Sequence, residues 1–317
     1  MPRYQDAYVP PAPPVIKTGG AGLRQEALVY AALSYYHRAM RIFEAVILGA
    51  VQGITEFLPV SSSGHLVVLQ QVFGIEGPVL LFDTMLHLGT LAAVFTVFRQ
   101  DLWRLARRPL QPLTALLCIA TVPAAAAALL FKARIDAAFE SGAYTGFGFL
   151  ITSLLLMVSE RRERRTRARG TKNEYTVTMP DALVIGLFQA AALVPGISRS
   201  GATVSAALLR RIDRSFAARF SFLLSVPVIL GALVLQVRNG FPSAEFSAVG
   251  LAPLCAGALT AGIVGFFSVK LMLKLTRKSD LWIFALYTAL LGAAVLTDQH
   301  LTHLFFPAAT AAASGGT

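Results

Sequence analysis

The sequence contains a polar segment whose residue types suit acid–base and nucleophilic chemistry. The segment QGITEFLPVSSSGH interrupts an apolar stretch and runs from Gln52 to His65. Gln52 and Glu56 are four residues apart and would share one face of a helix. A Glu within an apolar helix is a functional candidate, because burying its charge is costly. Serine or histidine becomes a nucleophile when a base or a cation activates it, and histidine also transfers protons near neutral pH. A lone serine would more simply cap a broken helix end, but this combination of residues indicates a reactive site.

A second polar segment suits phosphate binding. The segment PGISRSGAT runs from Pro195 to Thr203 and contains Ser198, Arg199 and Ser200. The planar guanidinium of an arginine binds two phosphate oxygens at once. Glycines let backbone N–H groups approach an anion, and the N-terminus of a helix favours negative charge. The alternative is that Arg199 pairs with Glu56 and holds the two segments together, and both roles are compatible.

A third segment, FDTMLHLGT, places Asp83 and His87 four residues apart at the start of an apolar stretch. The pair could support a metal ion or the catalytic histidine, and an ordinary hydrogen-bonded pair that stabilises the helix explains it equally well. Glu160 and Glu163 stand among several arginines. We expect these two glutamates to pair with the arginines at the protein surface.

The composition indicates that these segments lie in a membrane protein. Hydrophobic residues make up 55% of the chain and charged residues 14%, with a mean hydropathy of +0.62. Soluble proteins average about 25% charged residues. A membrane-spanning helix needs roughly 20 apolar residues. Six segments meet this need, at about 78–98, 113–131, 143–159, 216–237, 249–269 and 281–297.

Two further apolar segments are broken by the polar motifs. Residues 44–73 contain PVSSSGH and residues 182–209 contain PGISRSGAT. Irregular backbone at membrane depth is tolerated only where protein or a wet cavity surrounds it. We therefore expect each segment to form a re-entrant helical hairpin with its tip near the middle of the bilayer. The predicted fold is all-α and polytopic, with six transmembrane helices and two re-entrant hairpins.

The two hairpins begin halves that resemble each other. GAVQGITEFLPVSSSG and GLFQAAALVPGISRSG begin at Gly49 and Gly186, have equal length and share a glutamine and a final Ser-Gly pair. A re-entrant hairpin returns to its own side of the membrane, and three spans then carry the chain to the other side. The two repeats, about 44–159 and 182–297, would therefore have opposite orientations. Inverted repeats with broken helices place a site near the midplane where the repeats meet. Transporters use this architecture, so a transporter or lipid flippase is the alternative to an enzyme.

The positions of the basic residues predict the orientation. The net charge is +11, and loops 99–108, 161–172, 210–219 and 270–278 hold most of the 28 lysines and arginines. Such loops remain on the cytoplasmic side of a membrane, which places both termini outside. Because the basic residues lie between apolar segments, we expect no nucleic-acid partner.

The chain divides into three parts around this membrane region. We expect residues 1–41 to form a leader with a disordered start and an interfacial helix at 24–41. We expect residues 42–300 to form the membrane domain and residues 301–317 to form a flexible tail.

The three motifs, over about residues 43–297, resemble the undecaprenyl-diphosphatase family, which is also called the bacitracin-resistance family. The resemblance implies a phosphatase of the bacterial inner membrane whose active site faces the outer side. Such an enzyme converts undecaprenyl diphosphate to undecaprenyl phosphate and recycles this lipid carrier for cell-wall synthesis. Membership also implies bacitracin resistance, and we expect a homodimer as one form of the protein.

The resemblance implies roles for individual residues. Gln52 and Glu56 match the family's Glu/Gln-xxx-Glu motif, with Glu56 catalytic and near a Mg²⁺ or Ca²⁺ ion. Glutamine at position 52 weakens a metal-ligand role there. Ser62 is the preferred nucleophile, and His65 is a general acid or base or, alternatively, the nucleophile. The residues expected to contact the substrate are Ser61, Ser63, Ser198, Arg199, Ser200 and Thr203.

These roles combine into one expected reaction. The metal ion and Arg199 hold the diphosphate, Ser62 attacks the terminal phosphorus, His65 relays a proton and water releases phosphate. The acid-phosphatase-like lipid phosphatases are a rival class. Their motif needs a histidine six residues after its arginine, and Ser205 stands there.

Overall fold

The structure is a computed structural model that describes residues 40–75, 79–166, 171–239, 249–278 and 281–306. These residues form helices and no β-strand, which confirms the all-α prediction for this part of the chain. The predicted disordered start, almost all of the leader with its interfacial helix, and the tail beyond residue 306 lie outside the described residues. The elements are α2 (Ile42–Thr55), α3 (Ser62–Phe73), α4 (Leu80–Val97), α5 (Arg99–Arg107), α6 (Pro112–Leu130), α7 (Lys132–Ser141), α8 (Thr145–Thr166), α9 (Met179–Ala191), α10 (Arg199–Leu209), α11 (Arg214–Asn239), α13 (Leu251–Lys278), α14 (Trp282–Thr297) and a π-helical turn (Asp298–Thr302).

Each of the six predicted spans falls on a helix. Helices α4, α6, α11, α13 and α14 are long and apolar enough to cross a membrane. Helix α8 meets the same criterion together with α7, from which it bends by 105°. The protein is therefore a multi-pass membrane protein.

Two short helices occur where the sequence analysis predicts loops. Helix α5 carries several of the arginines of loop 99–108, and α7 contains Lys132 and Arg134. Neither contains a long apolar run, so a search for spans does not detect them. Helix α7 ends at Gly142, whose φ of 61° is the left-handed conformation that favours glycine after a helix.

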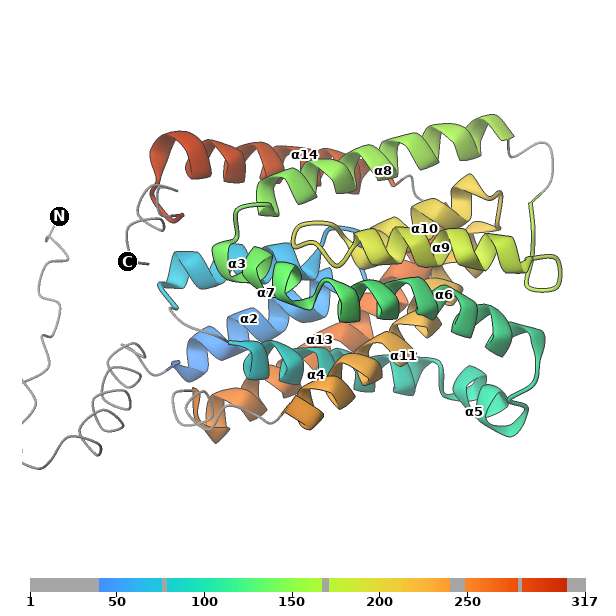
Figure 1. Cartoon of the computed structure of the whole chain (residues 1–317), viewed down its shortest axis with the longest axis horizontal. Coiled ribbons are helices and arrows are strands. Elements are labelled where there is room, and N and C mark those ends of the chain that lie inside the picture. Colours follow the sequence, from blue (N-terminus) through green and yellow to red (C-terminus); the bar gives the residue numbers. More distant parts are fainter. Residues whose placement is uncertain (1–39, 76–78, 167–170, 240–248, 279–280, 307–317) are drawn as a thin grey trace, which may run out of the picture. The chain divides into compact units, whose positions relative to one another are not determined.

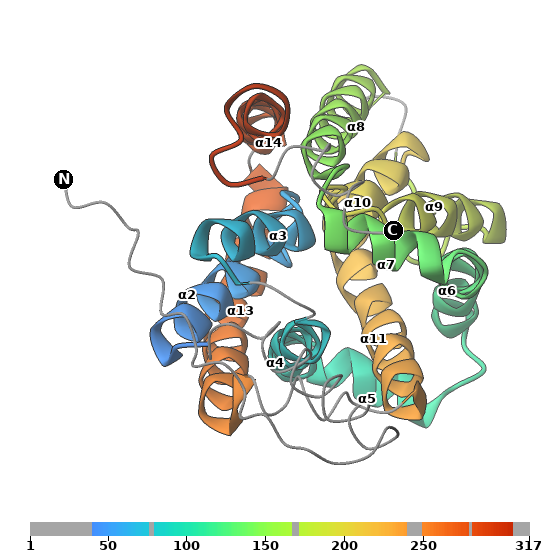
Figure 2. The ribbon, with the colours of Figure 1, turned by 60° about the vertical axis from the view of Figure 1, so that its left-hand side comes forward.

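Both predicted hairpins are present as pairs of helices with a break between them. Helices α2 and α3 are separated by residues 56–61, and α9 and α10 by residues 192–198. Figure 1 shows that α2 begins at the left of the bundle and α9 at its right, so the two hairpins enter from opposite ends and their tips meet in the interior. Figure 2 shows α10 surrounded by α8, α9 and α11, all of which it contacts.

Corresponding helices of the two halves make corresponding contacts. Helix α2 packs closely on α13, and α9 packs closely on α6. A side chain at Gly49 would collide with the carbonyl of Gly257, and one at Gly186 would collide with the carbonyl of Ala120. The number of residues from Gly49 to Gly186 equals the number from Ala120 to Gly257. The two helix crossings are therefore equivalent, as a duplication predicts, while the opposite orientation of the halves in a bilayer stays a prediction.

Candidate active site

The tips of the two hairpins are built in the same way. The hydroxyl of Ser61 accepts a hydrogen bond from the N–H of Gly64 at 3.3 Å, and the hydroxyl of Ser198 accepts one from Gly201 at 3.0 Å. Each serine thereby caps the helix that follows it. Ser61 has a φ of 71°, a conformation that is uncommon for a residue other than glycine and is often found at functional sites.

This capping leaves backbone donors available at both tips. The first turn of a helix has N–H groups with no acceptor within the helix, and the serine caps satisfy only the third of them. The N–H groups of the first two residues remain, which are Ser62 and Ser63 in α3 and Arg199 and Ser200 in α10. Two helix N-termini are therefore directed into one region, and such termini attract anions.

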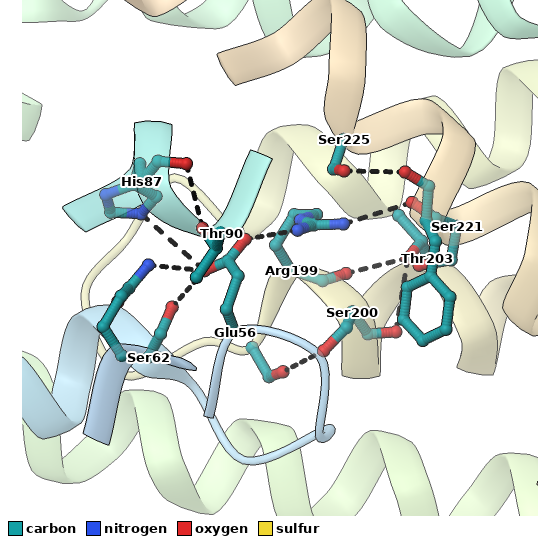
Figure 3. A network of polar contacts seen from close by, with 12 residues as sticks. Glu56, Ser62, His87, Thr90, Arg199, Ser200, Thr203, Ser221 and Ser225 are labelled. Atoms are coloured by element: carbon teal, nitrogen blue, oxygen red, sulfur yellow. Dashed lines mark hydrogen bonds and ion pairs between the residues drawn. The ribbon is translucent and has the colours of Figure 1, made fainter. Parts of the chain in front are cut away.

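The carboxylate of Glu56 connects the two tips (Figure 3). Its Oε2 accepts a hydrogen bond from the hydroxyl of Ser62 at 2.6 Å and one from the amide of Gln52 at 3.2 Å. Its Oε1 forms an ion pair with the guanidinium of Arg199. The side chain of Glu56 is 6% exposed. A buried carboxylate with a cation and a hydroxyl in contact is both neutralised and able to accept a proton.

Arg199 is held from both sides. Its Nη2 contacts Glu56, and its Nη1 donates to the main-chain carbonyl of Ser221 on α11 at 3.1 Å. The hydroxyls of Ser221 and Thr203 are 2.6 Å apart, and the hydroxyl of Ser200 donates to the carbonyl of Leu58 at 3.0 Å. Ser221 could not be predicted from the sequence, because a main-chain carbonyl leaves no signal there.

Helix α8 fixes the second tip. The hydroxyl of Thr152 accepts a hydrogen bond from the N–H of Ser198 at 2.9 Å and lies 3.0 Å from the carbonyl of Gly196. Thr152 is 1% exposed, so no water replaces these bonds at low cost. Thr152 could not be predicted from the sequence, because it resembles any small polar residue of a membrane helix.

His65 makes a different set of contacts from the other predicted catalytic residues. Its Nδ1 lies 2.6 Å from the carbonyl of Ser61, and its Nε2 lies 2.7 Å from the hydroxyl of Tyr287 on α14. Glu56, Ser62 and Arg199 thus share one network, while His65 is joined to it through the main chain of α3.

Asp83 and His87 are joined through the main chain. Nδ1 of His87 lies 2.7 Å from the carbonyl of Asp83, and the carboxylate of Asp83 accepts a hydrogen bond from Gln70 at 2.9 Å. Nε2 of His87 lies 3.7 Å from Oε2 of Glu56. His87 therefore lines the site beside Glu56, whereas the role predicted from the sequence was only a supporting one.

The oxygen atoms beside Glu56 suit a hard divalent cation. The buried Oε1 of Gln52 has no hydrogen-bond partner among the described residues. A carboxylate and an amide oxygen are a small donor set, and Mg²⁺ commonly binds through one or two carboxylates, waters and substrate phosphates. The described residues contain no cluster of three His, Cys, Asp or Glu side chains. The site thus fits an ion that depends on the substrate for part of its coordination.

The prediction that Glu160 and Glu163 are surface residues is wrong. They are 3% and 5% exposed, and both carboxylates contact the guanidinium of Arg214 at the start of α11. Glu160 also pairs with Arg164. The arginines next to these glutamates in the sequence suggest surface pairs, whereas the partner that buries the carboxylates comes from another helix.

Comparison with known proteins identifies the family. The family model described as "Bacitracin resistance protein BacA" matches residues 45–294. An undecaprenyl-diphosphatase of Carboxydothermus hydrogenoformans is 44% identical over 261 residues, which cover 82% of this chain and 98% of that protein. "Undecaprenyl-diphosphatase 4" of Bacillus thuringiensis is 40% identical over 266 residues, which cover 84% of this chain and 100% of that protein. An undecaprenyl-diphosphatase of Methanobrevibacter smithii is 37% identical, again with 84% and 100% coverage. The chain belongs to the bacitracin resistance protein BacA family.

Proposed function

We propose that this protein is a phosphatase that converts undecaprenyl diphosphate to undecaprenyl phosphate and inorganic phosphate. The observation that carries the proposal is the contact of one carboxylate, Glu56, with a serine hydroxyl and an arginine at the meeting point of two helix N-termini. These groups are a nucleophile, its base and a phosphate-binding cation. The names of the relatives support the same activity.

Binding of the diphosphate uses Arg199 and the backbone donors of both tips. The guanidinium has five N–H donors, and its contacts with Glu56 and Ser221 use only some of them. The N–H groups at the starts of α3 and α10 bind the remaining phosphate oxygens. Donors that are fixed before the substrate binds stabilise the developing charge without having to reorganise.

The chemistry begins at Ser62. Its oxygen attacks the terminal phosphorus, its proton passes to Glu56, and the bond from that phosphorus to the bridging oxygen breaks, so undecaprenyl phosphate leaves. Water then attacks the serine phosphate, and Ser62 regains a proton as phosphate departs. The direct hydrogen bond from Ser62 to Glu56 favours Glu56 over His65 as the base of the first step. We assign His65 to proton transfer at the phosphate oxygens or the attacking water.

A divalent cation fits beside these residues. Glu56 and Gln52 would hold it, and it would supply positive charge that neutralises phosphate oxygens.

We further propose that the protein lies in the bacterial inner membrane with its site accessible from the outer face. The basic loops at one end of the bundle support this orientation. Hairpin α2–α3, which carries the nucleophile, enters from the opposite end (Figure 1).

The test is phosphate release from undecaprenyl diphosphate by the purified protein in detergent. Arg199→Ala should lower kcat/KM by about 10³-fold or more, because loss of the arginine removes a charge from the transition state and also leaves Glu56 buried and unpaired. Arg134→Ala, which changes an exposed arginine of α7, is the control and should retain activity. A wild-type protein that binds the lipid but releases no phosphate would support the transporter alternative instead.

A further inference from the structure

The hydrogen bonds of His65 determine which ring nitrogen carries a proton. A carbonyl oxygen only accepts hydrogen bonds, so Nδ1, which is 2.6 Å from the carbonyl of Ser61, must donate. In the neutral ring, Nε2 then has a lone pair and no proton. The hydroxyl of Tyr287 lies 2.7 Å from Nε2 and is positioned to donate to it.

We infer that Tyr287 is a positioning residue for the reaction: its hydroxyl donates to Nε2 of His65 and so holds the neutral imidazole with its proton on Nδ1. The inference rests on the proposed function, in which His65 transfers protons. It assigns a role to a residue of α14 that neither the motifs nor the network around Glu56 include.

Aromatic contacts fix the plane of the ring as well as its tautomer. The rings of His65 and Tyr287 are stacked, with centroids 5.7 Å apart and an angle of 10° between their planes. Phe149 on α8 contacts the same imidazole edge-on, with centroids 5.3 Å apart and planes at 84°. Helices α8 and α14 pack closely on each other, so the two aromatic side chains come from adjoining helices. Together these contacts restrict rotation of the imidazole about its bond to Cβ.

A tyrosine in a membrane protein usually needs no special explanation, because its ring sits well at the lipid interface. Tyr287 differs because its hydroxyl contacts His65, which lies on a helix more than 200 residues earlier in the chain. The second hairpin has no counterpart to this contact, since Ala202 occupies the position that corresponds to His65. The Tyr287–His65 bond is therefore specific to the tip that carries the nucleophile.

The first experiment reads the tautomer directly. Nitrogen NMR of the detergent-solubilised full chain, with ¹⁵N-labelled histidine, distinguishes a protonated from an unprotonated ring nitrogen, and His65→Gln identifies the His65 signals among the five histidines. We expect a protonated Nδ1 and a hydrogen-bonded, unprotonated Nε2. In Tyr287→Phe, which keeps the ring and removes only the hydroxyl, the Nε2 signal should move to the position of a free acceptor. A wild-type His65 protonated on Nε2 alone, or an Nε2 signal that Tyr287→Phe leaves unchanged, would overturn the inference.

The second experiment measures phosphate release. Loss of one hydrogen bond of ordinary strength predicts a fall in kcat of about tenfold for Tyr287→Phe, with little change in KM, because the substrate's phosphates bind elsewhere. Tyr144→Phe, which changes an exposed tyrosine just before α8, should leave kcat unchanged. In a His65→Gln background, Tyr287→Phe should cause no further loss, because residues that act through each other are not additive.

Failure of the proposed role of His65 and failure of the positioning role of Tyr287 would give different results. If His65→Gln keeps full turnover, the proposed role of His65 is wrong, although the enzyme and its nucleophile remain. If His65→Gln is impaired while Tyr287→Phe equals the wild type, only the positioning role is refuted. An additive loss in the double variant would show that Tyr287 stabilises the fold without acting through His65.

Discussion

The two hairpin tips share a scaffold and differ in the chemistry that they present. Ser61 and Ser198 cap the two helices, and their hydroxyls lie 3.3 and 3.2 Å from those of Ser63 and Ser200 respectively. Between the members of each pair stands a different residue, Ser62 in one tip and Arg199 in the other. Both reach the same carboxylate, because each occupies the first position of its helix. A duplicated scaffold thus brings two equivalent positions to one point, where the two sequences place different groups.

The supporting positions differ in the same way. Glu56 corresponds to Leu193 and His65 to Ala202 in the second hairpin. In the proposed mechanism, the first hairpin therefore carries the acid–base and nucleophilic groups, and the second carries the cation. Ser198 and Ser200 are buried, whereas Ser62 and His65 are partly exposed. We therefore expect the second tip to bind the substrate and the first tip to be the side that the reacting phosphorus reaches.

The largest expected effects, of the same order as that of Arg199→Ala, come from removing the chemistry of the first tip. Ser62→Ala should lower kcat by about 10³-fold or more, and Glu56→Gln by about 10²- to 10⁴-fold, because one removes the nucleophile and the other its base. The turnover of the double variant should be only slightly lower than that of the less active single variant, since the two residues act as a unit. Phosphate release under saturating substrate measures all three.

The control for these variants is Ser153→Ala. Ser153 is a buried serine on α8 whose hydroxyl donates to the carbonyl of Ala285, away from Glu56. It should retain turnover. Near-normal turnover by Ser62→Ala would reject Ser62 as the nucleophile and point to His65.

A smaller effect should follow from loosening the second tip without touching its arginine. Thr152→Val keeps the shape of the side chain and removes the hydroxyl that accepts the N–H of Ser198. We expect a loss of about 1–3 kcal/mol in the free energy of unfolding and of about ten- to a hundredfold in kcat/KM, because Arg199 follows Ser198 directly. Thr152→Ser should restore both quantities.

Thr288→Val is the matched control for Thr152→Val. Thr288 is also buried, but within the described part of the chain its hydroxyl bonds only carbonyls of its own helix, α14. Denaturation and kinetics should therefore show a much weaker effect. An equal loss of kcat/KM in both valine variants would mean that the second tip does not depend on Thr152 in particular.

The sequence predicted the parts of the fold that have a local cause. An apolar run of span length identifies α4, α6, α8, α11, α13 and α14, and a Pro-Gly-Ser interruption identifies both tips. Helices α5 and α7 could not be predicted, because short charged helices lack such a run. The burial of Glu160 could not be predicted, because its partner Arg214 lies on another helix.

The site shows the same limit. Glu56, Ser62 and Arg199 could be named from residue type and spacing, and the structure brings these three together. The contacts of Thr152 and Tyr287 could not be predicted, because each joins helices that are far apart in the sequence. Threonine and tyrosine are also ordinary residues in membrane helices, so only the fold distinguishes these two from the rest.

The smallest expected effect concerns the bases of the hairpins, where Glu44 and Asp181 occupy equivalent positions. Glu44 pairs with Arg41 beside it in the sequence, whereas Asp181 binds both Lys172 and Arg210 at 2.7 Å, the latter just after α10. Burial by itself would raise the pKa of Asp181, but hydrogen bonds from Lys172, Thr178 and Arg210 lower it from 3.8 to about 2. Asp181 therefore ties the two helices of the second hairpin together only while it is charged.

Asp181→Asn should lower the melting temperature of the detergent-solubilised protein by a few degrees at pH 7. A pKa that is lower in the folded than in the unfolded state contributes stability that is complete above about pH 3.8 and is lost as the pH falls through about 2. The difference in melting temperature between Asp181→Asn and the wild type should accordingly shrink over this interval. Asp136→Asn, which breaks an exposed pair with Lys132, should change the melting temperature much less at any pH. A difference for Asp181→Asn that is as large at pH 2 as at pH 7 would mean that the charge of Asp181 does not hold the second hairpin closed.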